Sequence, residues 1–163
     1  MPVTQLGNET TTVYADGADF VMERVFAAPR ELVWKALTEA EHVPNWWGPR
    51  DIPMTVAAMD VKPGGTWRWV GHSSDGDVPF TGKYLEVVPP ERLVHTETFD
   101  VEPFNQLEPA LVTITLEEVD GGTRLRSSSR FPSVEALEGA LSTGMTGGAI
   151  ESWDRLDEVI ASF

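Results

Sequence analysis

Residues 145–163 read MTGGAIESWDRLDEVIASF, and the prediction of the fold starts from their periodicity. Its apolar side chains recur every three or four residues, which is the spacing of one face of an α-helix. This apolar stripe consists of Met145, Ala149, Trp153, Leu156, Ile160 and Phe163. Most of the stability of such a helix comes from packing its apolar face against another element. The stretch therefore predicts a long amphipathic helix with a partner layer elsewhere in the chain.

The partner is expected to be a sheet, because residues 52–131 consist of short alternating runs separated by turn signals. Pro63-Gly64-Gly65 and Asp120-Gly121-Gly122 are each typical of a turn between two paired strands. The strands expected here span residues 55–61, 66–72, 80–88, 92–100, 111–119 and 123–131. An earlier alternating run over 19–26 brings the expected sheet to about seven strands. Strands joined by short turns are antiparallel.

Shorter helices are expected on either side of this region. Pro29 suits the first turn of a helix over 30–38, and Ser133 is a good N-cap for one over 134–141. The capping-box form of Thr38-Glu39-Ala40-Glu41 predicts a second short helix that ends near Trp47-Gly48-Pro49. Residues 1–17 are polar and Thr-rich, and we expect a flexible lead-in there, with a short edge strand at 10–14.

These elements predict one α+β domain over residues 18–163. The sheet has one apolar face and the final helix has one apolar stripe, so both are buried if the sheet curves around the helix. The expected architecture is a helix-grip fold. It combines a curved antiparallel sheet of about seven strands, a long C-terminal helix, and two short helices after the first strand.

Charge and composition exclude several classes of function. The 163 residues include 26 Asp and Glu against 12 Lys and Arg, a net charge of −14, which disfavours nucleic-acid and anionic-membrane partners. The absence of Cys excludes disulfides and thiolate chemistry. No stretch has the length and apolarity of a membrane span, and Met1 to Asn8 lack the features of a cleavable signal. A cytoplasmic protein is the expectation.

Six short motifs in this order resemble the START-like superfamily, and specifically its activator-of-heat-shock-protein-90-ATPase-like branch. Together they cover about residues 19–162. The motifs are Ala28-Pro29-Arg30-Glu31-Leu32-Val33-Trp34, Trp46-Trp47-Gly48-Pro49, Asp60-Val61-Lys62-Pro63-Gly64-Gly65-Thr66-Trp67, Gly82-Lys83-Tyr84-Leu85-Glu86-Val87 with Pro89-Pro90-Glu91-Arg92-Leu93, Asp120-Gly121-Gly122-Thr123-Arg124-Leu125, and Glu151-Ser152-Trp153-Asp154-Arg155-Leu156. The resemblance implies a helix-grip fold and, in many relatives, a cavity between the sheet and the long helix. Relatives include lipid carriers, cyclases and a co-chaperone domain, so the resemblance does not imply one chemistry.

The residues expected to form a ligand pocket are aromatic side chains of the sheet and its first connection, and small side chains of the final helix. Gly148, Ala149 and Ser152 are small residues on a helix that faces a sheet, and they would leave volume unfilled. The alternative is that they only let the helix approach the sheet closely. The predicted ligand-binding residues are Trp46, Trp47, Trp67, Trp69, Tyr84, His95, Glu97, Met145, Ala149, Ser152 and Trp153. For Trp46, Trp47, Trp67 and Trp69 the alternative is that they only pack in the core.

His95 and Glu97 share one face of a predicted strand with Leu93 and Phe99. A polar pair on an apolar face is typical of a small-molecule pocket, where burial can prepare both groups for acid–base chemistry. The alternative is an outward-facing, solvated pair. His95, Glu97 and Tyr84 are the candidate catalytic residues. The histidine separations match no metal-ligand spacing, so we expect neither a metal nor another cofactor.

Three functions remain open at this point. The first is the binding of a hydrophobic or aromatic small molecule between the sheet and the C-terminal helix. The second is a cyclase, dehydratase or hydrolase that acts on such a ligand. The third is an interaction module that stimulates a chaperone ATPase, as the name of the family branch suggests. A homodimer also stays open as an assembly.

Overall fold

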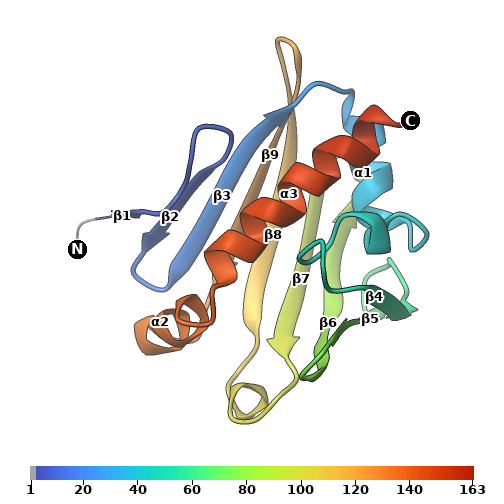
Figure 1. Ribbon diagram of the computed structural model, residues 1–163. Coiled ribbons are helices and arrows are strands. Elements are labelled where there is room, and N and C mark those ends of the chain that lie inside the picture. Colours follow the sequence, from blue (N-terminus) through green and yellow to red (C-terminus); the bar gives the residue numbers. More distant parts are fainter. Residues whose placement is uncertain (1–2) are drawn as a thin grey trace.

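The computed structural model describes residues 3–163, which form one nine-stranded antiparallel sheet with helices against one face (Figure 1). The order of the strands across the sheet is β1-β2-β3-β9-β8-β7-β6-β5-β4. Their bounds are β1 Thr4–Gln5, β2 Thr12–Asp16, β3 Asp19–Phe26, β4 Met54–Met59, β5 Thr66–Ser73, β6 Gly76–Val88, β7 Arg92–Phe99, β8 Ala110–Val119 and β9 Gly122–Arg130. Only the β3–β9 pairing joins strands that are not consecutive in the chain.

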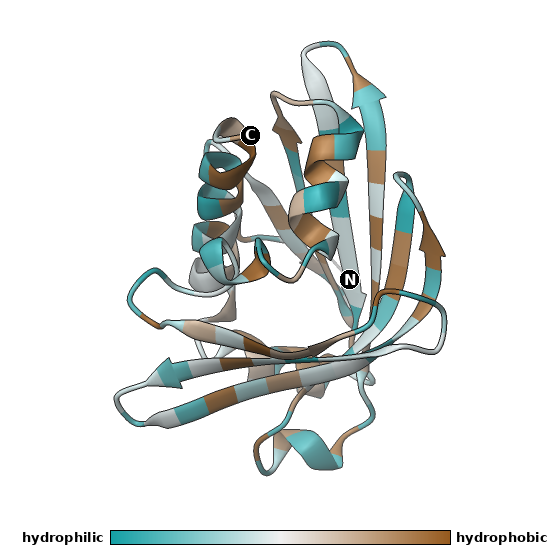
Figure 2. Ribbon diagram, turned by 90° about the vertical axis from the view of Figure 1, so that its right-hand side faces the viewer, coloured by the Kyte–Doolittle hydropathy of each residue, from teal (hydrophilic) through white to brown (hydrophobic). Residues whose placement is uncertain are grey.

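The long helix α3 (Met145–Ala161) runs diagonally across the sheet, which curves around it (Figures 1 and 2). Helix α1 (Arg30–Thr38) lies beside the later part of α3, and α2 (Val134–Leu141) precedes it. Single 3₁₀ turns lie at Val43–Asn45 (η1) and Phe104–Gln106 (η2). The predicted α+β helix-grip architecture is therefore confirmed.

The sheet has nine strands rather than about seven because residues 3–17, expected to be a flexible lead-in with a short edge strand at 10–14, contribute β1 and β2. Strand β2 pairs with β3 along its whole length, and the Val13 side chain is fully buried in the core. Thr11, just before β2, is also fully buried. The expected edge strand overlaps β2, whereas the two residues of β1 are too few to show a period in the sequence.

The predicted second helix is reduced to the 3₁₀ turn η1. Thr38, expected to cap that helix, instead closes the last turn of α1: its hydroxyl donates to the backbone oxygen of Trp34 over 2.7 Å. Pro44 lies at the start of η1, and its ring has no N–H to extend a helical ladder. The chain therefore leaves helical geometry within one turn.

Buried side chains gather in two clusters. The larger cluster joins α1 and α3 to β3, β8 and β9, and includes Phe26, Leu125, Trp153 and Leu156. The smaller one lies under β4–β7 and includes Trp67, Trp69, Tyr84 and Leu93. Gly82 makes room for the smaller cluster, because a Cβ there would lie 2.5 Å from Nε1 of Trp67 and 1.9 Å from the backbone oxygen of Thr96.

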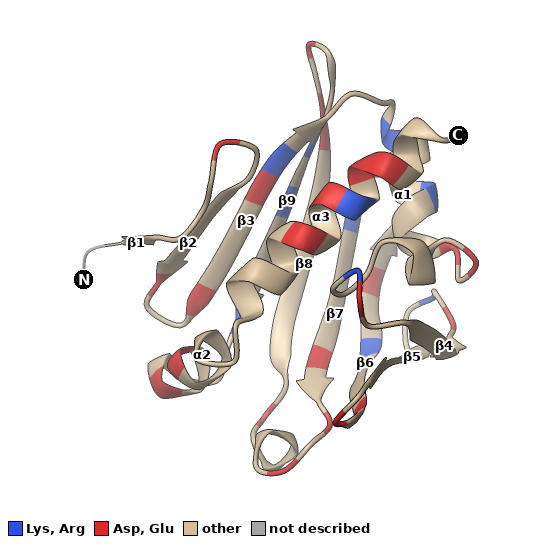
Figure 3. Ribbon diagram, in the orientation of Figure 1, with Lys and Arg blue, Asp and Glu red and all other residues tan. Residues whose placement is uncertain are grey.

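Within residues 3–163, no helix is both long and apolar enough to cross a membrane. Acidic residues lie in loops, on strands, on α2 and on α3 from Glu151 onwards (Figure 3). The first turns of α3, residues 145–150, carry no charge. This uncharged end of α3 faces the site described next.

Candidate functional site

A cavity of about 410 Å³ lies between the sheet and helices α2 and α3. Its volume is within the range of about 300–1,000 Å³ that small-molecule sites usually have. The wall is predominantly apolar, and its aromatic members are Trp47, Phe80, Phe99, Phe104 and Phe131. The site thus has the size and surface of a pocket for a hydrophobic molecule.

On the sheet side, the cavity begins where large side chains give way to small ones. Trp67, Trp69 and Gly71 alternate along β5 and share one face. Both tryptophans are buried in the smaller core cluster, whereas Gly71 lines the cavity. Across the ladder Gly71 is opposite Val78 and Trp69 is opposite Phe80, so the open volume lies at one end of this face. The change from Trp to Gly along one strand creates the space.

On the helix side, side-chain size changes in the same direction. Met145, Gly148, Ala149 and Ser152 follow one helical stripe and line the cavity. Trp153, Leu156 and Ile160 continue towards the C-terminal end and are buried in the larger core cluster. Large residues therefore hold the helix to the sheet at one end, while small residues at the other end leave the two layers apart.

A loop that is hydrogen-bonded to α3 forms one edge of the cavity. Trp47, Gly48 and Pro49 line the cavity, and α3 holds their backbone through two side chains. The Gly48 N–H donates to Oγ of Ser152 over 2.8 Å. One terminal nitrogen of Arg155 donates to the backbone oxygen of Gly48 over 2.7 Å, and the other donates to that of Pro44 over 3.3 Å. These contacts fix the loop against the helix.

Substitution of Arg155 by Met is expected to lower the free energy of unfolding by about 2 kcal/mol, because hydrogen bonds from a charged donor are lost and loop carbonyls stay unpaired. Thermal or urea denaturation measures this loss. Amide hydrogen exchange should also speed up at residues 46–50. The matched variant Arg50→Met removes an exposed pair with Glu158 and should change stability little. Equal losses of stability in the two variants would contradict the conclusion that Arg155 holds the loop against α3.

Glu97 brings a carboxyl group into this apolar wall. It lies on β7, two residues before Phe99 and on the same face, and both residues line the cavity. Burial raises the pKa of Glu97 to about 7, because the ionised form loses hydration and gains no counter-charge. No hydrogen bond or ion pair joins its carboxyl group to another group of residues 3–163. The second carboxyl of the lining, Glu108, is exposed.

His95 and Tyr84, predicted beside Glu97, lie outside the cavity lining. They are opposite each other on β7 and β6, with ring centroids 6.0 Å apart, and the His95 ring meets Trp67 edge-on. The Nδ1 of His95 lies 3.1 Å from the backbone oxygen of Thr96, and burial lowers the pKa of His95. Burial raises the pKa of Tyr84. The structure thus separates the three candidate catalytic residues into a buried ring pair and a cavity carboxyl.

The predicted tryptophans also divide. Trp47 lines the cavity, and its ring meets Phe80 and Trp69 edge-on, at centroid distances of 4.9 and 5.4 Å. Trp46, Trp67, Trp69 and Trp153 are buried in the two core clusters instead. The Trp46 indole donates to the backbone oxygen of Ala36 over 2.9 Å. Of the predicted ligand-binding residues, the cavity brings together Trp47, Glu97, Met145, Ala149 and Ser152.

Several lining residues were not anticipated. They include Ile52, Gly71, Val78, Phe80, Phe104 and Phe131. Gly71 had a signal in the sequence, because it shares a strand face with two tryptophans and is much smaller. Phe104 had none, because it lies in the long connection between β7 and β8, where no period fixes a direction.

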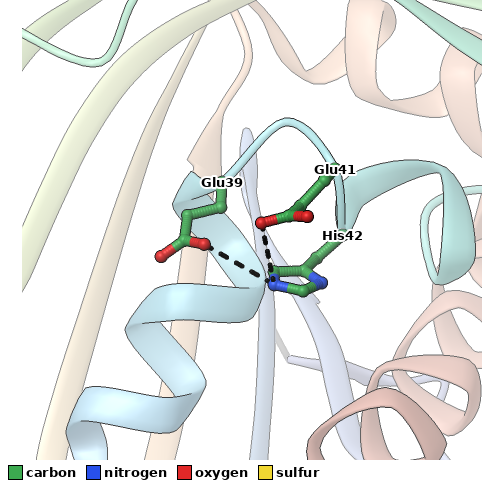
Figure 4. A group of neighbouring side chains, drawn as sticks. All are labelled: Glu39, Glu41 and His42. Carbon is green, nitrogen blue, oxygen red and sulfur yellow. Dashed lines mark ion pairs between the residues drawn. The ribbon is translucent and has the colours of Figure 1, made fainter.

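A second group of polar side chains lies outside the cavity lining (Figure 4). Nε2 of His42 is 3.6 Å from a carboxylate oxygen of Glu39 and 3.8 Å from one of Glu41. The ligand atoms of the three residues lie within 4.8 Å of one another. Both carboxylates are largely exposed, and exposed acidic groups commonly cluster without an ion. The two contacts have the length of ion-pair contacts.

An antiparallel sheet that curves around a C-terminal helix and leaves an apolar cavity between them defines the helix-grip class of START-like domains. The sequence profile of the family described as activator of Hsp90 ATPase homolog 1-like protein matches residues 27–161. The chain belongs to this family.

Solved structures share the whole fold. Ms6760 from Mycobacterium smegmatis is 27% identical, with a TM-score of 0.81, and the match covers 97% of this chain and 96% of that chain. A protein from Rhodobacter sphaeroides is 28% identical, with a TM-score of 0.80, and the match covers 99% of each chain. A protein from Arthrobacter aurescens is 24% identical, with a TM-score of 0.84 over 93% of this chain and 91% of that chain, and shows the fold alone. No curated protein matches the chain significantly.

Proposed function

We propose that this protein binds a hydrophobic or aromatic small molecule in the cavity between the sheet and the uncharged end of α3. The observation that supports this most directly is that small residues face each other on the two walls of the cavity. Gly71 on β5 and Gly148 with Ala149 on α3 lie around the same volume of about 410 Å³. Protein interiors are normally close-packed, so a volume of this size bordered by five aromatic rings favours an occupant.

Filling the cavity from α3 tests this function. In the Gly148→Leu variant a side chain enters the cavity, and no atom outside the local helix backbone lies within 4 Å of a Cβ built at this position. Binding of the neutral dye Nile red, followed by its fluorescence, is expected to weaken at least about tenfold. Stability should be unchanged or higher, because Leu is a better helix former than Gly by about 1 kcal/mol.

The adjacent glycine provides the matched control. Gly147 is also helical and also has open space at its Cβ position, but it is exposed and outside the cavity lining. Gly147→Leu should therefore bind Nile red like the wild type. Undiminished binding by Gly148→Leu would contradict the proposed site. Native mass spectrometry of gently purified protein gives a second readout, in which a co-purifying molecule is expected in the wild type and in Gly147→Leu only.

Binding is favoured over turnover because, of the three residues considered for acid–base chemistry, Glu97 alone lines the cavity. A cyclase, dehydratase or hydrolase reaction would need a second polar group near the ligand. The other polar side chains of the lining are Glu108, which is exposed, and Thr98, Thr143 and Ser152. The hydroxyls of Thr143 and Ser152 are already engaged with backbone groups.

The family description supports a second candidate, stimulation of an Hsp90-type chaperone ATPase. This activity would use the surface of the domain rather than its cavity. The test is a chaperone ATPase assay with the full chain. Stimulation that is equal for the wild type and Gly148→Leu would support the second candidate over the first. A chaperone ATPase rate that stays at its basal value would exclude the second candidate.

A further inference from the structure

The charged groups of the cavity lining all have one sign. Among the residues that the structure describes, the lining includes the carboxyl groups of Glu97 and Glu108 and no Lys, Arg or His. The chain as a whole carries a net charge of −14. Among the side chains of the lining, an anionic head group would find no positive charge, whereas a cationic one would find two carboxyl groups.

The aromatic side chains form a continuous row beside Glu97. Ring centroids are 4.9 Å apart for Trp47 and Phe80, 5.0 Å for Phe80 and Phe99, and 5.3 Å for Phe99 and Phe104. Phe99 is on the same strand face as Glu97. Aromatic ring faces attract cations through the ring quadrupole, and cages of such rings bind organic ammonium groups. A carboxylate beside such a row adds an acceptor for a charge-assisted hydrogen bond.

We propose that the ligand of this cavity is an organic amine, with its ammonium group on Glu97 and its apolar body against the aromatic row. This inference rests on the proposed function and names the ligand class of the same site. Within residues 3–163 no cationic group pairs with the carboxyl group of Glu97, and burial raises its pKa because the ionised form loses hydration. A bound ammonium would supply the missing partner and favour the ionised carboxylate.

Three probes with one common body test the proposal: naphthylmethylamine, naphthylmethanol and naphthoate, each titrated calorimetrically at about pH 8, where the carboxyl group of Glu97 is mostly ionised. For the wild type, the amine is expected to bind at least about tenfold more tightly than the alcohol, and the carboxylate more weakly than both. In Glu97→Gln, the amine and the alcohol should bind within about twofold of each other, through a loss of amine affinity.

The alcohol also reports whether the cavity of Glu97→Gln is intact, because its affinity should stay near the wild-type value. Glu117→Gln is the matched control. It removes one negative charge from an exposed side chain of β8 that lies outside the lining, and it should keep the preference for the amine.

The outcomes separate the two proposals. Equal affinities of the wild type for amine and alcohol, or an undiminished preference in Glu97→Gln, would overturn the amine proposal and leave the binding function standing. Failure of the wild type to bind any of the three probes or Nile red would overturn both.

Discussion

Substitution of Trp153 by Ala is expected to lower the free energy of unfolding by about 3–5 kcal/mol. The side chain is 7% exposed, lies in the larger core cluster, and meets Phe26 edge-on with ring centroids 6.0 Å apart. Its removal leaves a void where α3 packs on β3, and neighbouring side chains can close it only in part. Urea denaturation of the wild type and the variant measures the loss. Trp153→Phe keeps a ring and should lose roughly half as much.

Trp47→Ala is the contrasting variant. Trp47 is half-buried and lines the cavity, so its loss should cost less stability than that of Trp153 while weakening the binding of Nile red. Similar stability losses in the two variants, or full dye binding by Trp47→Ala, would contradict the division between core tryptophans and a cavity tryptophan.

The second large effect is a loss of stability with rising pH that depends on Glu97. The pKa of the Glu97 carboxyl group is about 7 in the folded protein, compared with 4.5 for an ordinary glutamate, which stands for the unfolded chain. The folded state therefore holds the proton more tightly. The contribution of Glu97 to stability is fully present below about pH 4.5 and is lost as the pH rises through about 7. The loss over the whole window is up to about 3 kcal/mol, because a tenfold change in proton affinity is worth about 1.4 kcal/mol.

Comparison with Glu97→Gln isolates this contribution. Relative to the variant, the wild type should lose about 2 kcal/mol between about pH 5.5 and about pH 8. His95 is on the same strand face and acts with the opposite sign, because its lowered pKa adds stability as the pH rises, but it is present in both proteins. Urea midpoints at the two pH values provide the measurement. An identical difference at both would contradict burial of an uncompensated carboxyl group, and Glu117→Gln should show no such trend.

Much of the fold could be predicted because its elements carry strong local signals. The hairpin at Asp120-Gly121-Gly122 and the stripe through Trp153 and Leu156 need no knowledge of distant residues. The strand β2 was anticipated only as a short edge strand at 10–14, because its place in the sheet depends on pairing with β3 and on one buried side chain, Val13. The capping-box pattern at Thr38 was misleading because that hydroxyl bonds backwards to α1.

The site was harder to predict than the fold. The sequence indicates which residues share a strand face. It does not indicate where along that face the packed core ends and the cavity begins. Trp67 and Gly71 share a face of β5, yet the first fills the core and the second borders the cavity. His95 and Glu97 are separated in the same way on β7. The boundary depends on how far α3 and the loop at Gly48 reach across the sheet, which is a tertiary property.

Much of the cavity wall lies outside the two core clusters, so the wall can change in sequence more freely than the core. Val78, Phe99 and Gly148 line the cavity but belong to neither cluster, so replacements there leave the main packing contacts intact. Selection can then change the chemistry of the bound molecule while the framework persists, as is compatible with domains 27% or 28% identical that superpose with TM-scores of 0.81 and 0.80. The same freedom suits the domain to directed evolution, where libraries confined to these three positions should yield mostly folded receptors with altered selectivity.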